Sequence, residues 1–214
     1  MPRGTLICFE GLDRTGKSTQ AARLVLRLRS LNLPVLHLRF PDRTTPIGQQ
    51  INSYLTNSTD LSDQAIHLLF SANRWEHAQE IREAIAAGTT VVMDRYVYSG
   101  VVYSVAKGVE GLRVDWCWAP EVGLPRPDLT VYLQLREGEA ESREGFGGER
   151  YEKREVQARV KGLFEELVGA DDRAMVVEAK GSVEKVEGWV WEAVEGAMGT
   201  IGKRQPPLLT VEKR

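Results

Sequence analysis

The chain has 214 residues, of which 42% are apolar and 27% charged, and this composition suits one globular α/β domain with a sizeable core. The formal net charge of −2 leaves no excess of base to hold a nucleic-acid backbone, so we expect no nucleic-acid partner and no structural DNA-binding role. No apolar stretch approaches about 18 residues, and the amino terminus runs directly into a strand, so we expect neither a membrane span nor a signal segment.

Short apolar runs alternate with helical patterns along the chain. The runs predict strands at Thr5–Glu10, Val35–Phe40, Thr89–Asp94, Leu129–Leu135 and Ala174–Glu178. Apolar spacing predicts helices after residue 17 and at Asp63–Ala87, Tyr98–Lys107, Glu149–Val168 and Val183–Met198. This alternation predicts a mostly parallel five-stranded sheet with helices on both faces. We expect one domain over residues 1–201, followed by a loosely ordered, Pro-interrupted tail over 202–214.

The stretch "FEGLDRTGKST", residues 9–19, contains the spacing Gly11-x-x-x-x-Gly16-Lys17-Ser18. A strand should precede it and a helix should follow it, which is the context that a phosphate-binding loop requires. Glycines let backbone N–H groups surround phosphate oxygens, and the helix terminus adds partial positive charge. Lys17 would bridge the outer phosphates and Ser18 would bind Mg²⁺. The alternative is a Gly-rich turn that contains a lysine by chance.

A second motif, "TTVVMDRY", ends an apolar strand in a carboxylate. Asp94 could hold the hydration shell of Mg²⁺, or it could simply cap a turn. Arg95 follows at once, and its planar fork suits an acceptor phosphate, although a surface ion pair would also explain an arginine here.

Two further arginines accompany aromatic residues. "RFPDR" places Phe40, Pro41 and Arg43 at the carboxyl end of a predicted strand, where ligands of parallel sheets bind. "FSANR" places Phe70 and Arg74 four residues apart on one helix face. A ring beside a guanidinium suits a planar base, while core packing of Phe70 and a solvated face for Arg74 are the alternatives.

Together, "FEGLDRTGKSTQ", "FPDRTTPIGQQIN", "HLLFSANRWE", "DRYVYSGVVYSVAKG", "DWCWAPEVGLPRPDLTVYLQL" and "FGGERYE" resemble the thymidylate kinase family, and most closely its eukaryotic-type members. The resemblance runs from about Leu6 to Leu167. It implies the P-loop nucleoside monophosphate kinase fold in three layers, and the reaction ATP + dTMP → ADP + dTDP, in the synthesis of dTTP. Such catalysis consists mainly of alignment and charge neutralisation.

The resemblance also implies roles for individual residues. Arg14, Lys17 and Arg95 would be catalytic, with Arg14 acting like an arginine finger supplied in cis. Ser18 and Asp94 would hold Mg²⁺. ATP would be bound by Gly11, Asp13, Arg14, Thr15, Gly16, Lys17, Ser18, Thr19 and Arg143. The dTMP pocket would consist of Asp13, Phe40, Pro41, Arg43, Phe70, Arg74, Arg95, Ser99, Gly100, Tyr103 and Tyr151.

Within that pocket, Phe70 would stack on thymine, Arg74 would bond its O4 edge, Tyr103 would crowd the sugar 2′ position, and Tyr151 would close over the site. The resemblance also implies a lid at about residues 137–150, with Arg143 and Arg150 in it and Arg154 just after it. In other family members a lid arginine has the catalytic role, so the lid arginines are the alternative to Arg14. We expect Arg143 to flank the adenine. Gly181 and Ser182 fit the family's adenine loop less well.

The main rival function is another nucleoside monophosphate kinase of the same fold, for adenylate or guanylate. A GTPase switch would need an Asn-Lys-x-Asp stretch, and the sequence has none. Cys8 and Cys117 are expected to be reduced core thiols, with a disulfide as the alternative, which indicates a cytoplasmic protein compatible with nuclear presence. Family resemblance implies a homodimer packed through helices, and the helix after Asp63 could supply the patch.

Overall fold

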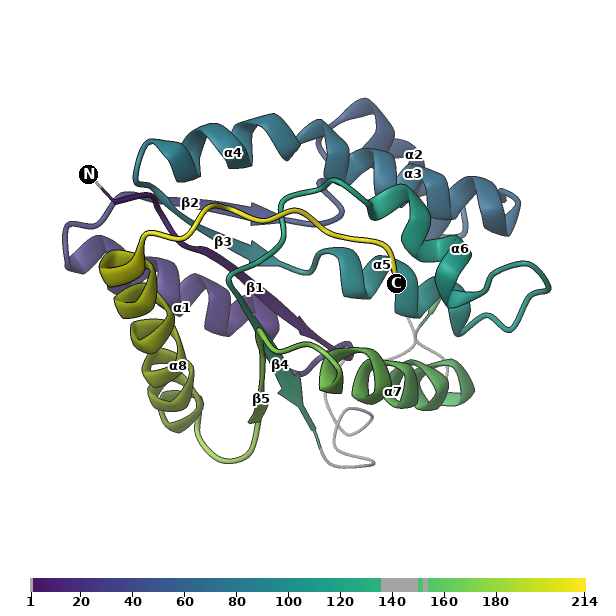
Figure 1. Cartoon of the computed structure of the whole chain (residues 1–214). Coiled ribbons are helices and arrows are strands. Elements are labelled where there is room, and N and C mark those ends of the chain that lie inside the picture. Colours follow the sequence, from purple (N-terminus) through teal and green to yellow (C-terminus); the bar gives the residue numbers. More distant parts are fainter. Residues whose placement is uncertain (1, 136–149, 152–153) are drawn as a thin grey trace.

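The computed structural model describes residues 2–135, 150–151 and 154–214 of the chain. Its centre is a five-stranded, entirely parallel sheet in the order β2-β3-β1-β4-β5 (Figure 1). The strands are β1 (Leu6–Gly11), β2 (Val35–Arg39), β3 (Thr90–Asp94), β4 (Leu129–Gln134) and β5 (Ala174–Glu178). The predicted α/β fold is therefore confirmed, with each strand end within one residue of its expected position.

Helices cover both faces of the sheet (Figure 1). They are α1 (Lys17–Ser30), α2 (Pro46–Leu55), α3 (Asp63–Glu76), α4 (Ala78–Ala86), α5 (Val97–Val105), α6 (Val114–Trp118), α7 (Arg154–Gly169) and α8 (Val183–Arg204), with a short 3₁₀ turn, η1 (Ala119–Glu121). Apolar faces of α1 and α8 meet one side of the sheet, and α4, α5 and α7 meet the other. Both faces of the central strands are therefore buried, which explains their continuous apolar runs.

Several helical features differ from the sequence prediction, among them α6, which was not predicted, and α8, which extends beyond Met198 to Arg204. The helix expected over Asp63–Ala87 is two helices, because the chain breaks at His77. The imidazole of His77 contacts Asp42 Oδ2 at 3.1 Å and Glu80 Oε2 at 2.8 Å, so the break is tied to the loop that follows β2. Helix α2 was not predicted, although its start is encoded: Thr45 caps it by accepting from the Gly48 amide at 3.0 Å, and Pro46 follows at the first helical position.

The carboxyl-terminal tail also differs from expectation, since the structure packs it against the domain. The Arg126 amide donates to Leu209 O at 2.9 Å, and the Val211 amide donates to Leu124 O at 2.8 Å. Trp118 Nε1 donates to Glu212 O at 2.7 Å, and the Arg214 guanidinium lies 4.4 Å from the Trp118 ring centroid. The polar composition and prolines of the tail predicted a loosely ordered segment. Its backbone groups are instead hydrogen-bonded to the loop before β4, which its own sequence does not reveal.

Within the described part of the chain, no helix is both long enough and apolar enough to cross a membrane. Cys8 and Cys117 are buried and unpaired, as expected for reduced core thiols.

Candidate active site

The turn between β1 and α1 has the backbone geometry that the glycine spacing predicted. Gly11 has φ 144° and Gly16 has φ 92°, both in a region that L side chains rarely adopt. A Cβ at Gly11 would also lie 2.5 Å from Leu133 O on the neighbouring strand. Arg14, at the tip, has φ 64°, so this position too favours glycine backbone. The loop is thus a fixed turn that leads directly into the amino terminus of α1.

Lys17 folds back over this loop and is almost fully buried. Its Nζ donates to Leu12 O and, at 3.2 Å, to Thr15 Oγ1. Burial, followed by the charge of Arg95, lowers the pKa of Lys17 to about 7, although nearby carboxylates including Asp13 act in the opposite direction. An anion bound in the loop would favour the charged ammonium and so raise the pKa of Lys17.

Ser18 and Asp94 meet where the loop faces the end of β3. Ser18 Oγ donates to Asp94 Oδ2 at 2.5 Å, and Asp94 is 2% exposed. Asp94 Oδ1 is buried and has no hydrogen-bond partner among the described residues. An orphaned carboxylate oxygen beside a serine hydroxyl is a donor set that fits Mg²⁺, which takes few protein ligands and keeps waters and phosphates for the rest. A turn cap would not leave this oxygen unpaired.

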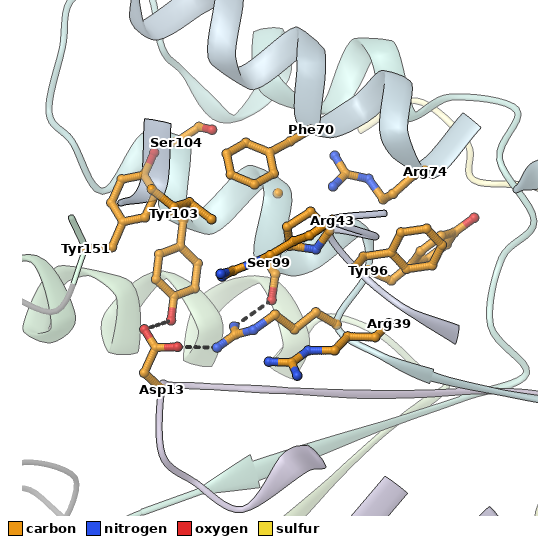
Figure 2. A pocket seen from close by; sticks show the side chains of 15 residues that line it. Asp13, Arg39, Arg43, Phe70, Arg74, Tyr96, Ser99, Tyr103, Ser104 and Tyr151 are labelled. Carbon is orange, nitrogen blue, oxygen red and sulfur yellow. Dashed lines mark hydrogen bonds and ion pairs between the residues drawn. The ribbon is translucent and has the colours of Figure 1, made fainter. Parts of the chain in front are cut away.

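Beside the loop lies a pocket of about 210 Å³ at the carboxyl ends of the strands (Figure 2). The structure brings all eleven predicted dTMP-binding residues into its lining, from Asp13 in the loop to Tyr151 before α7. The sequence analysis missed four further lining residues: Arg39, Leu55, Tyr96 and Ser104. Arg39 and Ser104 each lie next to a residue that was predicted, Phe40 and Tyr103, so adjacency was the available signal.

Asp13 joins the phosphate loop to this pocket. Its carboxylate accepts hydrogen bonds from Arg95 Nη2 and from Tyr103 Oη at 2.8 Å (Figure 2), and also from Gln157 Nε2 at 3.0 Å. Burial acts to raise the pKa of Asp13, but the Arg95 charge and the other donors outweigh it, so this pKa is lowered. The group is therefore a fixed anion that orients one cation and one phenol over the pocket.

Arg95 lies in a strained turn after β3, with φ 68°. Its Nη1 donates to Ser99 Oγ at 3.2 Å and to Gly11 O at 3.3 Å. Glu10, whose carboxylate is fully buried, fixes this turn. It accepts hydrogen bonds from the Tyr96 amide at 2.9 Å, the Ser99 amide at 3.1 Å and Ser99 Oγ at 2.5 Å. The alternative of a surface ion pair is wrong for Arg95, because the side chains of Arg95 and its partner Asp13 are only 18% and 23% exposed and Arg95 lines the pocket.

Phe70 and Arg74 both project from α3 into the pocket (Figure 2). Phe70 is half-buried and also touches the small cluster around Ile51 and Ile66, so it combines a packing role with a free ring face. Arg74 is only 2% exposed, so the alternative of a solvated helix face is wrong. A ring and a buried guanidinium at one end, with Arg95 at the other, give the pocket an apolar, planar part and an anion-binding part.

Three comparisons with known proteins identify the family. A family model described as thymidylate kinase matches residues 9–189. The chain belongs to the thymidylate kinase family. It is 50% identical to the thymidylate kinase of Dictyostelium discoideum over 86% of this chain and 82% of that one. It is 44% identical to the thymidylate kinase of Homo sapiens, over 94% and 95%.

Among solved structures, a thymidylate kinase from Candida albicans superimposes with a TM-score of 0.85 and 40% identity, covering 100% of this chain and 99% of that one. This agreement confirms the nucleoside monophosphate kinase fold that the resemblance implied. In this thymidylate kinase family member, the pocket lies where the loop after β1, the end of β3 and α5 converge.

The remaining predicted residues lie at the edges of this thymidylate kinase site. Phe40 is buried against Tyr96, with ring centroids 5.4 Å apart, and Arg43 Nη1 donates to Asn52 Oδ1 at 3.0 Å. Tyr151 packs edge-on against Tyr103 at 5.6 Å, where it covers the pocket. Thr15 is buried and Thr19 is exposed at the start of α1.

The lid is only partly visible. Arg143 and most of the lid predicted at 137–150 lie outside the described residues, as does the side chain of Arg154. Arg150, at the end of that segment, donates from Nη1 to Asp60 Oδ1 at 2.9 Å and from Nε to Tyr54 O at 3.1 Å. In this structure Arg150 is therefore engaged with the α2 end of the pocket. Gly181 has φ 100° and Ser182 caps α8, accepting from the Lys185 amide at 3.3 Å.

Proposed function

We propose that the protein transfers the γ-phosphoryl group of ATP to dTMP with Mg²⁺, giving ADP and dTDP for dTTP synthesis. The observation that carries this proposal is the pocket itself, which abuts a phosphate loop and contains an aromatic ring, a buried guanidinium and Arg95. Family membership supports the same reaction, since the relatives are thymidylate kinases.

In this mechanism the phosphate loop, through Thr15, Lys17, Thr19 and its backbone amides, binds the ATP phosphates. Ser18 and Asp94 hold Mg²⁺, which neutralises charge on the phosphates when it is bound. Because a nucleoside monophosphate is already an oxyanion near neutral pH, no side chain has to remove a proton. The chain's contribution is therefore alignment and charge placement for an in-line transfer.

On the acceptor side, Arg95 and Arg43 bind the dTMP phosphate, while Phe70 stacks on thymine and Arg74 donates to its O4 edge. Tyr103 closes the sugar end against a 2′-hydroxyl. Asp13 keeps Arg95 and Tyr103 in register with the loop, as its hydrogen bonds indicate. Arg14 reaches the transferring group from the loop tip, and Arg143 flanks the adenine.

A coupled ADP-release assay tests the proposal, with ATP-Mg²⁺ and each nucleoside monophosphate in turn. We expect dTMP to be the preferred acceptor, and Lys17→Ala or Ser18→Ala to abolish transfer in a chain that remains folded. Equal or higher turnover of AMP or GMP would favour the rival kinases of the same fold. Near-normal turnover in either folded variant would remove the phosphate-loop assignment.

We also propose that the protein is a homodimer that packs through α3. Leu68 and Trp75 on this helix are 47% and 39% exposed, and their spacing of seven residues places them on one helix face, where they could form an apolar contact with a second copy. Sedimentation of the wild type and of Leu68→Glu tests this, with a change from dimer to monomer expected. The unpaired thiols of Cys8 and Cys117 suit the reducing cytoplasm, which we propose as the compartment.

A further inference from the structure

The guanidinium of Arg74 is held by a carboxylate that the proposed mechanism does not use. Glu121, at the end of η1, is fully buried, and its Oε2 accepts from Arg74 Nε at 2.7 Å while its Oε1 accepts from Nη2. This paired arrangement fixes both the position and the rotation of the guanidinium. Burial alone would lower the pKa of Arg74, but Glu121 outweighs it and this pKa is raised, so the arginine remains charged.

The backbone of α5 confines Arg74 on another side. A Cβ built on Gly100 would lie 2.4 Å from Arg74 Nη2 and 2.8 Å from both Cζ and Nη1. The guanidinium therefore lies flat against the one residue type that leaves room for it. Together, Glu121 and Gly100 restrict Arg74 to a single plane at the wall of the pocket.

This restraint leaves the Nη1 amino group, and the second N–H of Nη2, for a ligand. The bonds to Glu121 use Nε and Nη2, and Nη1 donates to no protein atom within the described residues. Figure 2 shows the guanidinium directed into the pocket beside the Phe70 ring. A guanidinium only donates hydrogen bonds. At the edge of a pyrimidine it therefore donates to a carbonyl oxygen at position 4, whereas an amino group there, itself a donor, finds no acceptor on the guanidinium.

We propose that Glu121 is a specificity-positioning residue, which selects pyrimidines with a 4-carbonyl over those with a 4-amino group by fixing Arg74. This inference rests on the proposed function, because it takes a deoxynucleoside monophosphate as the occupant of the pocket. The predicted selection is between thymine or uracil on one side and cytosine on the other. The 5-methyl group plays no part in it.

A purely structural role for Glu121 makes a different prediction. Helix α3 is already fastened to η1 by Ser71 Oγ and Trp75 Nε1, which donate to Pro120 O at 3.1 and 2.8 Å. If Glu121 only added to this fastening, its loss would lower stability without changing which base is preferred. Ser71→Ala is the matched control, because it removes one bond between the same two elements and leaves the Arg74 ion pair intact.

The experiment measures kcat/KM for dTMP, dUMP and dCMP in wild type, Glu121→Gln and Ser71→Ala, with titration calorimetry of the same nucleotides to obtain the ratios independently of turnover. Loss of a hydrogen bond from a charged donor lowers affinity or kcat/KM for the ligand by about 10- to 100-fold. We expect the dTMP/dCMP ratio to fall by about that factor in Glu121→Gln. The dTMP/dUMP ratio should stay constant, since both bases carry the 4-carbonyl, and Ser71→Ala should change neither ratio.

A double-variant cycle tests whether Glu121 acts through Arg74. In an Arg74→Met background, adding Glu121→Gln should leave the dTMP/dCMP ratio unchanged. If Glu121→Gln does not fold, Glu121→Asp, which retracts the carboxylate by one methylene, should show a smaller fall in the same ratio.

An unchanged dTMP/dCMP ratio in folded Glu121 variants would overturn the inference while leaving the proposed kinase reaction intact. A wild type that binds dTMP without phosphorylating it would overturn the reaction alone, because calorimetry still reports the base preference. Equal affinities of the wild type for dCMP and dTMP would show that the protein does not select the 4-carbonyl group at all.

Discussion

Replacing Gly100 by alanine should damage nucleotide recognition while leaving the fold intact. The added Cβ would lie 2.4 Å from Arg74 Nη2, and ordinary contact begins at 3.4 Å, so the guanidinium must retreat by 3.4 − 2.4 = 1.0 Å. Glu121 holds that guanidinium through two hydrogen bonds, so the retreat distorts these bonds and tilts the guanidinium plane while the two charges remain paired. A misplacement of about 1 Å in a positioning group can cost about 10²-fold in rate, which is the loss we expect in kcat/KM for dTMP.

The stability change in this variant should be small. Alanine in place of glycine within a helix stabilises by about 1 kcal/mol, whereas overpacking costs about 1–3 kcal/mol. The net loss of about 0–2 kcal/mol leaves the protein folded, so activity can be measured. The assay is steady-state kinetics with dTMP varied at saturating ATP, together with thermal unfolding.

Gly188→Ala in α8 provides the matched control. A Cβ at Gly188 meets no atom within 4 Å, so only the gain in helix propensity remains. That gain should raise the melting temperature by about 2–4 °C and leave kcat/KM unchanged. Wild-type kcat/KM in Gly100→Ala would refute the idea that a fixed guanidinium plane is needed for substrate use.

Three further predictions follow from the site. Arg14→Gly suits the left-handed backbone at this position and should lower kcat by about 10²–10⁴-fold with little change in either KM; an unchanged kcat at saturation would remove Arg14 from catalysis. Tyr103→Ala should bring kcat/KM for dTMP and its ribonucleotide together, and a ratio equal to wild type would assign sugar selection elsewhere. His67 is buried with Nδ1 accepting from Ser104 Oγ, and burial, then the charge of Arg74, lowers its pKa from 6.5 to about 4. Between pH 6.5 and 4 the unfolded chain binds a proton at His67 and the folded chain does not, so the free energy of unfolding should fall by up to about 3 kcal/mol over this range. A His67→Gln variant should lose that part of the pH dependence, measured by urea titrations at each pH.

Local signals in the sequence determined most of the fold. The apolar runs of β1, β3 and β4 form strands that are buried on both faces, as central parallel strands must be, whereas the edge strands β2 and β5 are partly exposed. The start of α2 was also readable from Thr45 and Pro46, and overlooking that cap was an error of interpretation. By contrast, the break at His77 depends on an imidazole that reaches Asp42, 35 residues away, and no local pattern encodes that contact.

The site divides in the same way. Residues in motifs, such as Lys17 and Arg95, could be proposed from the sequence because each motif places its chemical groups within a few positions. Glu10 and Glu121 were missed, since each acts on a partner far along the chain: Glu121 lies 47 residues from Arg74, and Glu10 lies 89 residues from Ser99. The docking of the tail similarly depends on pairing with residues near 124, which its own composition does not reveal.

The position of Asp13 links the proposed donor site to the proposed acceptor site. This carboxylate belongs to the loop that would contact the donor, yet it holds Arg95 and Tyr103 of the acceptor pocket. If ATP binding shifts the loop, the guanidinium of Arg95, which would bind the dTMP phosphate, must therefore move with it. Thermodynamic linkage then requires the effect to be mutual, so whatever factor ATP adds to the affinity for dTMP, dTMP returns to ATP. In the proposed reaction, this single carboxylate would couple the binding of the donor to the binding of the acceptor.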